Sequence, residues 1–109
     1  MEDRATENRI NWKVNARKIY DAIRAAKDPG GEAWCYFRGK RLAVLEAGFG
    51  YEPADGPPGT IVKMTPRGVE VVTGAGVVVL RRVRIEGEEE EAAIEALMKA
   101  GAELHAVLG

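Results

Sequence analysis

Between residues 32 and 85, short runs of β-prone residues alternate with turns rich in glycine and proline, and this spacing strongly limits the possible folds. The runs cover residues 33–38, 41–47, 60–64, 69–73 and 77–85. Because the connections Gly39-Lys40, Pro66-Arg67-Gly68 and Gly74-Ala75-Gly76 are tight, neighbouring runs should pair antiparallel. The sequence therefore predicts a mainly β chain of about five to six strands, closed into a small barrel that protects its strand edges.

One longer connection interrupts this series at residues 48–59. It contains Pro53, Pro57 and Pro58, and proline cannot donate a backbone hydrogen bond to a central strand or a helix. We expect an ordered surface loop here.

A helix is expected on each side of the β-rich region. The first runs to about Lys27, where Asp28-Pro29-Gly30-Gly31 stops it, and either Asn11 or Asn15 is a suitable N-cap. The second covers residues 88–99, with four glutamates in its first turn, where the helix dipole favours them. Residues 1–8 are expected to be a flexible entry or linker remnant, which leaves residues 9–109 as one domain.

The first helix has two chemically different faces. At about 100° per residue, one side carries Ala16, Ile19, Ala22, Ile23 and Ala26, and we expect Ile19 and Ile23 to be buried against the barrel. Cations and one aromatic ring gather roughly opposite: Lys13, Arg17, Tyr20, Arg24 and Lys27. Such a face suits polyanions, although a basic helix face is also often simply solvated.

The net charge of −1 conceals an asymmetry along the chain. Residues 1–85 carry 15 Lys/Arg and 10 Asp/Glu, giving +5, whereas residues 86–109 carry a net charge of −6. This balance argues against an indiscriminate nucleic-acid coating protein but allows a local basic patch. The N-terminus lacks a secretory signal and no apolar run is long enough to span a membrane, so a cytoplasmic location is expected.

Catalytic chemistry has little support in the residues. Cys35 and His105 are the single cysteine and histidine, which excludes an internal disulfide framework and a cysteine-based zinc site. Cys35 lies among aromatic residues and is expected to be a buried or half-buried thiol. Neither a phosphate-binding loop nor a dinucleotide fingerprint is present, so we predict no catalytic residue, no cofactor and no metal site.

A second group of cations lies at the turn between the first two predicted strands. Arg38, Lys40 and Arg41 follow the aromatic residues Tyr36 and Phe37. Cations beside aromatic rings suit phosphate neutralisation and stacking on exposed bases.

Several segments resemble the C-terminal domain of the methionyl-tRNA formyltransferase family. They include Arg9-Ile10-Asn11-Trp12, Gly39-Lys40-Arg41-Leu42, Pro58-Gly59-Thr60-Ile61 and Glu86-Gly87, in the order and spacing of that family. The resemblance implies a small open antiparallel Greek-key barrel related to the oligonucleotide-binding fold, with the first helix packed on it. It also implies that the catalytic domain, with its Asn, His and Asp, is missing from this chain.

Two hypotheses of function follow from this resemblance. In the first, the chain is a non-catalytic formyltransferase domain that helps to bind the initiator tRNA, with phosphate contacts from Lys13, Arg17, Arg24 and Lys27. Arg38, Lys40 and Arg41 would extend that surface. In the second, it is an interaction module that docks on a separately encoded formyltransferase catalytic domain, which acts on tRNA or on an amino sugar.

Overall fold

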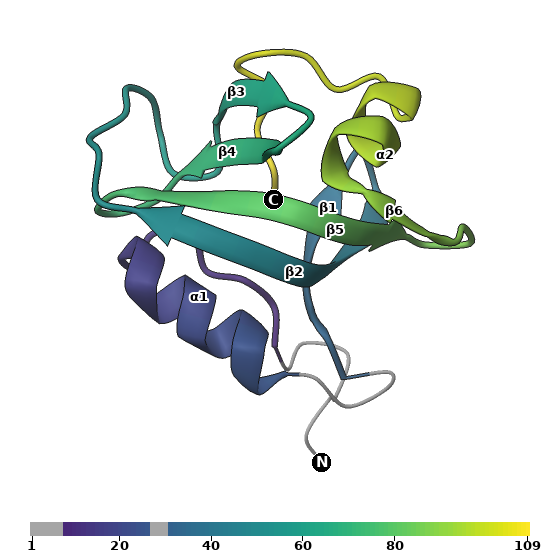
Figure 1. Ribbon diagram of the computed structural model, residues 1–109, viewed down its shortest axis with the longest axis horizontal. Coiled ribbons are helices and arrows are strands. Elements are labelled where there is room, and N and C mark those ends of the chain that lie inside the picture. Colours follow the sequence, from purple (N-terminus) through teal and green to yellow (C-terminus); the bar gives the residue numbers. More distant parts are fainter. Residues whose placement is uncertain (1–7, 27–30) are drawn as a thin grey trace.

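The computed structural model describes residues 8–26 and 31–109 as one curled antiparallel sheet with two helices. Helices α1 and α2 lie on opposite sides of the long central pair β2–β5 in Figure 1. This arrangement confirms the mainly β prediction with a helix towards each end of the chain. In chain order the elements are α1 (Ala16–Ala25), β1 (Ala33–Phe37), β2 (Lys40–Gly50), β3 (Ile61–Thr65), β4 (Gly68–Val72), β5 (Val77–Ile85), β6 (Glu90–Ala92) and α2 (Ala93–Lys99).

The sheet has a Greek-key order. Its strands run β1-β2-β5-β4-β3, and the short β6 pairs with β5. Strands β3, β4 and β5 form a meander, and the long connection after β2 allows that strand to lie beside β5. The predicted open antiparallel Greek-key sheet is therefore confirmed.

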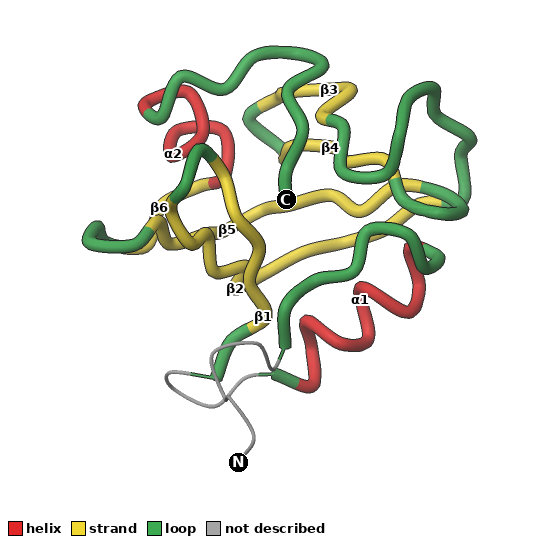
Figure 2. The backbone as a smooth tube through the Cα atoms, turned by 180° about the vertical axis from the view of Figure 1, so that it is seen from behind, coloured by secondary structure: helices red, strands yellow, loops and turns green. Residues whose placement is uncertain are grey.

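The C-terminal segment links the two edge strands of this sheet. The backbone N–H of Ile61 donates to the carbonyl of Ala106 (2.8 Å), which adds the segment to the β3 edge. Gly109 and Tyr36 then exchange hydrogen bonds of 2.8 and 3.2 Å at the β1 edge. Figure 2 shows this segment running from α2 past β3 to the C-terminus. The sheet is thus closed by a short irregular segment rather than by direct pairing of β1 with β3.

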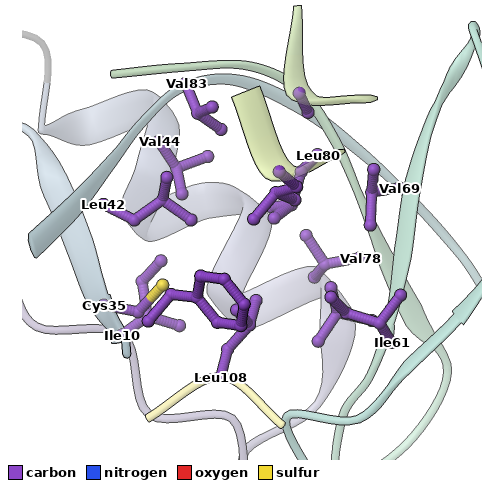
Figure 3. Packing of buried hydrophobic residues seen from close by; sticks show 14 of the residues in the cluster. Ile10, Cys35, Leu42, Val44, Ile61, Val69, Val78, Leu80, Val83 and Leu108 are labelled. Atoms are coloured by element: carbon purple, nitrogen blue, oxygen red, sulfur yellow. The ribbon is translucent and has the colours of Figure 1, made fainter. Parts of the chain in front are cut away.

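One hydrophobic cluster fills the space that the sheet encloses. Strand residues such as Leu42, Val78 and Leu80 meet Ile10 and Leu108 from the two ends of the described chain (Figure 3). Both helices contribute to the same cluster, through Ala16, Ile19 and Ile23 of α1 and Ala93, Ala96 and Leu97 of α2. A single core therefore holds the helices and the sheet together.

Helix α1 starts at the later of the two predicted caps. The side-chain oxygen of Asn15 accepts a hydrogen bond from the Lys18 N–H (2.8 Å), whereas Asn11 accepts one from Lys13 in the preceding turn (3.1 Å). Ile19 and Ile23 are each 3% exposed, as expected. Ala22, which the sequence placed on the same apolar side, is exposed, because it lies about 90° around the helix from the middle of the buried stripe.

Parts of the predicted first helix and entry segment fall outside the described residues. Lys27 and the stop at Asp28-Pro29-Gly30 are among them, as are residues 1–7 of the expected flexible entry. Within the described chain, the helix ends at Ala25.

The β1–β2 turn differs by one residue from the prediction. Phe37 pairs with Lys40, so Arg38 and Gly39 form a two-residue turn with φ values of 52° and 82°. Positive φ at both positions matches the sense of twist that a two-residue hairpin needs. The predicted Gly39-Lys40 turn is therefore wrong by one position.

Strand β2 extends beyond its predicted end at Ala47. Gly48 and Gly50 continue the pairing with β5, opposite Val79 and Val77. The predicted 48–59 loop was wrong at this end because a long partner strand supplies the hydrogen bonds that offset the weak strand preference of glycine. The loop begins after Gly50, with Tyr51 as its first residue.

The helix predicted over residues 88–99 is also shorter than expected. Glu90 and Glu91 belong to β6, where they lie opposite Arg84 and Val83, and α2 starts only at Ala93. Strand pairing and the ion pair between Glu90 and Arg82 outweigh the preference of glutamates for a helix N-terminus. The expected placement of four glutamates in the first helical turn is therefore wrong.

Cys35 is fully buried in the core, and burial raises the pKa of its thiol to about 12 from an ordinary value of 9.0, while the charge of Arg9 acts in the opposite direction. Burial of the thiol was expected from the sequence. Because the thiolate is disfavoured in this position, Cys35 is unsuited to be a nucleophile at neutral pH.

The pKa of Cys35 predicts a loss of stability at alkaline pH. Below pH 9 the thiol is protonated in both states, but between about pH 9 and pH 12 it ionises only in the unfolded chain, which favours unfolding. From pH 8 to pH 10 we expect the natural chain to lose about 1.4 kcal/mol more unfolding free energy than Cys35→Ala, measured by urea denaturation. An identical pH dependence for the two chains would contradict this account.

Candidate nucleic-acid interface

The exposed side of α1 and the end of β2 form a surface of cations and aromatic rings. We call it the helix cluster, and its members are Arg17, Tyr20, Arg24, Phe49 and Tyr51. Burial of Ile19 and Ile23 places the helical members at the margin of the core, next to the last residues of β2. Residues from two elements about 30 positions apart in sequence thus share one surface.

The rings of the helix cluster form a row. The Tyr20 and Phe49 centroids are 4.9 Å apart, and the Phe49 and Tyr51 centroids are 5.5 Å apart with their planes nearly perpendicular. A guanidinium lies over each of the first two rings, that of Arg24 at 5.6 Å from Tyr20 and that of Arg17 at 5.7 Å from Phe49. These contacts orient the cations beside aromatic surface.

The two arginines of the cluster remain accessible to solvent. The side chain of Arg17 is 59% exposed although its Nε donates to Asp21 at 3.3 Å. Hydrogen bonding and charge attraction from Asp21, followed by a hydrogen bond that Arg17 donates to Tyr51, raise the pKa of Arg17, so that it stays charged at any physiological pH. Arg24 is also exposed and lies in the last turn of α1.

Lys13 lies outside the helix on which the sequence placed it. It is exposed in the turn before Asn15, and its carbonyl lies against Gly74 of the β4–β5 connection. It therefore extends the basic surface at the N-terminal end of α1 rather than continuing the helical face. Exposed Lys18 adds a further cation within the helix.

The second group of predicted cations borders a hollow of about 180 Å³ at the tip of the β1–β2 hairpin. We call it the hairpin hollow. Its lining combines apolar side chains with four cations and one carboxylate: Phe37, Arg38, Lys40, Arg41, Leu42, Ile85, Glu88, Lys99 and Ala100. Sequence reasoning missed Lys99, because nothing in the local pattern shows that α2 packs beside this turn.

Cations of the hairpin hollow have structural partners, and the guanidinium of Arg41 lies 3.8 Å from the centroid of the Trp34 ring. Nη1 of Arg38 donates to the Ala100 carbonyl at 3.3 Å, at the C-terminal end of α2, where the helix dipole favours positive charge. Nζ of Lys99 donates to both carboxylate oxygens of Glu91, at 2.9 and 3.0 Å, and these contacts raise its pKa. Glu88 and Glu91 thus reduce the positive charge at the hollow.

The helix cluster and the hairpin hollow do not form one continuous patch. Tyr20 and Arg17 contact Phe49 near the end of β2, whereas Lys40 is the first residue of that strand. Eleven residues of strand at about 3.3 Å each place these points on the order of 30 Å apart. The structure thus brings together Arg17 and Arg24 on one surface, and Arg38, Lys40 and Arg41 on another.

The sequence analysis also missed Phe49 and Tyr51, which it assigned to a loop. The available signal was the alternation Phe49-Gly50-Tyr51, which continues the β2 pattern. Tyr51 is 77% exposed, an unusually accessible position for a large ring.

Metal-ligand clusters and membrane-spanning helices are both absent from the part of the chain that the structure describes. Within residues 8–26 and 31–109, no three His, Cys, Asp or Glu side chains come together as potential metal ligands. In the same residues, no helix is long and apolar enough to cross a membrane.

Comparison with known proteins relates the chain to formyltransferases. The family model described as "Formyl transferase, C-terminal domain" matches residues 4–100. A methionyl-tRNA formyltransferase of Sorangium cellulosum is 37% identical over 91 residues, covering 82% of this chain and 29% of the relative. Those of Thiobacillus denitrificans and Thermus thermophilus are 33% and 32% identical, covering 76% and 74% of this chain and 27% and 26% of the relatives.

The chain spans little more than a quarter of the length of these curated relatives. The matched family model covers almost the whole chain, and the Sorangium relative exceeds 30% identity over most of it. The chain therefore belongs to the formyl transferase C-terminal domain family.

Proposed function

We propose that this chain is a non-catalytic domain that contributes electrostatic tRNA binding to a formyltransferase in the cytoplasm. The observation that carries the proposal is the helix cluster, where exposed Arg17 and Arg24 lie beside aromatic rings on one surface. The names of the relatives identify methionyl-tRNA formyltransferases, which supports a tRNA as the partner. The initiator tRNA is the natural first candidate for this ligand.

Phosphate contacts account for the expected affinity. Arg17 and Arg24, with Lys13 and Lys18 nearby, offer a small number of cations on one side of the domain. A few such contacts give micromolar or weaker binding at physiological salt, because each contact releases about one condensed counterion. Binding should therefore weaken steeply as salt increases, with little dependence on base sequence.

The hairpin hollow has a secondary place in this proposal. Arg38, Lys40 and Arg41 offer further cations, but Glu88 lies in the same hollow and Arg38 is engaged with α2. Because the hairpin hollow lies far from the helix cluster, only an extended ligand could reach both surfaces. A tRNA is long enough to do so, whereas a small molecule is not.

Charge reversal in the helix cluster tests the proposal. We expect Arg17→Glu/Arg24→Glu to weaken binding of initiator tRNA by about tenfold or more at 50 mM salt. The slope of the logarithm of the binding constant against the logarithm of salt concentration should decrease in magnitude by about two, because about two phosphate contacts are lost. The measurement is a filter-binding or anisotropy titration at several salt concentrations, with circular dichroism to verify folding.

The matched control reverses two exposed cations elsewhere. Lys63→Glu/Arg67→Glu changes the net charge equally but lies on β3 and the turn after it. We expect this variant to bind more tightly than the helix-cluster variant. Equal losses in the two variants, or no salt-sensitive binding by the natural chain, would contradict the proposed interface.

Docking on a formyltransferase catalytic domain is a second candidate function. Three exposed aliphatic side chains come from a short stretch around the end of α2: Met98 (63% exposed), Leu104 (53%) and Val107 (54%). Exposed apolar side chains of this size favour contact with a protein surface. The occupant would be the part of a formyltransferase that this chain does not match.

Removal of this apolar surface tests the second candidate. We expect the natural chain to bind the isolated catalytic domain of a methionyl-tRNA formyltransferase in a calorimetric titration, and Met98→Ser/Leu104→Ser to bind at least tenfold more weakly. Arg17→Glu/Arg24→Glu is the control and should retain that binding. Docking is contradicted if the serine variant binds as well as the natural chain.

A further inference from the structure

We propose that the helix cluster binds an unpaired nucleotide, with its base stacked on Tyr51 and its phosphate beside Arg17. This inference rests on the proposed RNA-binding function and specifies which part of an RNA that surface takes. It requires that Tyr51 be accessible, that its position be fixed and that a cation lie within reach of the same nucleotide.

Accessibility is the first requirement. Tyr51 is 77% exposed, whereas Tyr20 and Phe49, the other two rings of the row, are half-buried. Since Tyr51 stands nearly perpendicular to Phe49, that contact leaves most of its ring surface open to solvent. A planar base could therefore lie against the ring without displacing a core residue.

The second requirement is a fixed position for the ring. Tyr51 directly follows Gly50, which pairs with Val77 at the end of the β2–β5 ladder. Its ring contacts Phe49, which in turn contacts Tyr20 of α1. Helix α1 and strand β2 thus orient the Tyr51 ring. A ligand would therefore not have to order a free loop before its base stacks on that ring.

The third requirement is a nearby cation. The guanidinium of Arg17 lies over Phe49, the ring next to Tyr51, and its side chain remains 59% exposed. A phosphate attached to a base on Tyr51 would lie within reach of this guanidinium. Asp21 forms an ion pair with Arg17, and Glu52 follows Tyr51 in the sequence. The local positive charge is therefore moderate, and ring contacts matter more for affinity.

The other exposed tyrosine of the described chain does not offer the same platform. Tyr36 is 38% exposed, and the guanidinium of Arg9 lies 5.0 Å from its ring centroid. Its ring also contacts Trp34, at a centroid distance of 5.1 Å. Tyr36 is therefore a suitable control for the effect of removing an exposed tyrosine.

Stacking selects unpaired nucleotides over a double helix. In A-form RNA the faces of the bases are covered by their neighbours, so a duplex could engage Arg17 and Arg24 but not Tyr51. Single strands, loops and chain ends expose base faces, and stacking of one base on an aromatic side chain strengthens binding by about five- to a hundredfold. The helix cluster should therefore prefer single-stranded RNA when charge is matched.

The experiment compares two RNA probes and four proteins. A labelled single-stranded RNA of about 24 nucleotides and a blunt duplex of about 12 base pairs, which carry nearly the same number of phosphates, are titrated by anisotropy at 50 mM salt. The proteins are the full 109-residue chain and its variants Tyr51→Ala, Tyr51→Phe and Tyr36→Ala. Thermal unfolding verifies that each variant folds.

We expect Tyr51→Ala to lose about five- to a hundredfold in affinity for the single strand, with duplex binding and the salt dependence unchanged. Tyr51→Phe keeps the ring and should retain binding, as should Tyr36→Ala. Equal affinity of Tyr51→Ala and the natural chain for the single strand, or equal affinity of the natural chain for the two probes, would overturn the inference.

The result also separates this inference from the proposed function. Suppose that Arg17→Glu/Arg24→Glu loses salt-sensitive binding to tRNA while Tyr51→Ala binds the single strand as tightly as the natural chain does. The inference of base stacking on Tyr51 is then wrong, and the proposed electrostatic binding of tRNA stands. If the natural chain binds neither tRNA nor the single strand, both are wrong.

Discussion

Burial of one side of α1 in the shared core is the constraint on which the proposed interface depends. Ile19 and Ile23 are almost inaccessible, and Tyr20 and Arg24 each follow one of them by one position, about 100° around the helix. The same packing that stabilises the helix thus turns these side chains towards its margin. There Tyr20 contacts Phe49, because β2 continues to Gly50 along its partner strand, and the guanidinium of Arg24 lies over Tyr20.

Closure of the sheet by the C-terminal segment is a second constraint on the fold. The hydrogen bond from the Ile61 N–H to the Ala106 carbonyl, and the two between Gly109 and Tyr36, occupy backbone groups that two edge strands would otherwise expose. The segment also brings Leu108 into the core, where it is 2% exposed. Lys99 and Ala100, just before this segment, lie beside the β1–β2 turn and line the hairpin hollow.

Much of the fold could be predicted from local patterns, but the arrangement of the proposed RNA-binding surface could not. The burial of Ile23 followed from helical spacing, and the strand ending at Ile85 followed from a β-prone run between turns. Glu90 was misplaced because pairing with β5 decides its conformation, and local preference does not reveal this. Tyr51 is linked to α1 through Phe49, which contacts Tyr20, and Lys99 lies beside the β1–β2 turn because of packing between elements distant in sequence. The basic residues were visible in the sequence, whereas their division into two separate surfaces was not.

The central claim is that RNA is bound by the helix cluster rather than by the hairpin hollow. The most direct measurement is a titration of the isotopically labelled chain with initiator tRNA fragments, followed by the backbone amide resonances. The account predicts that the largest shifts occur in α1 and at residues 49–52, with smaller changes around Lys40 and Lys99. Shifts confined to residues 38–41 and 99, with α1 unaffected, would contradict it.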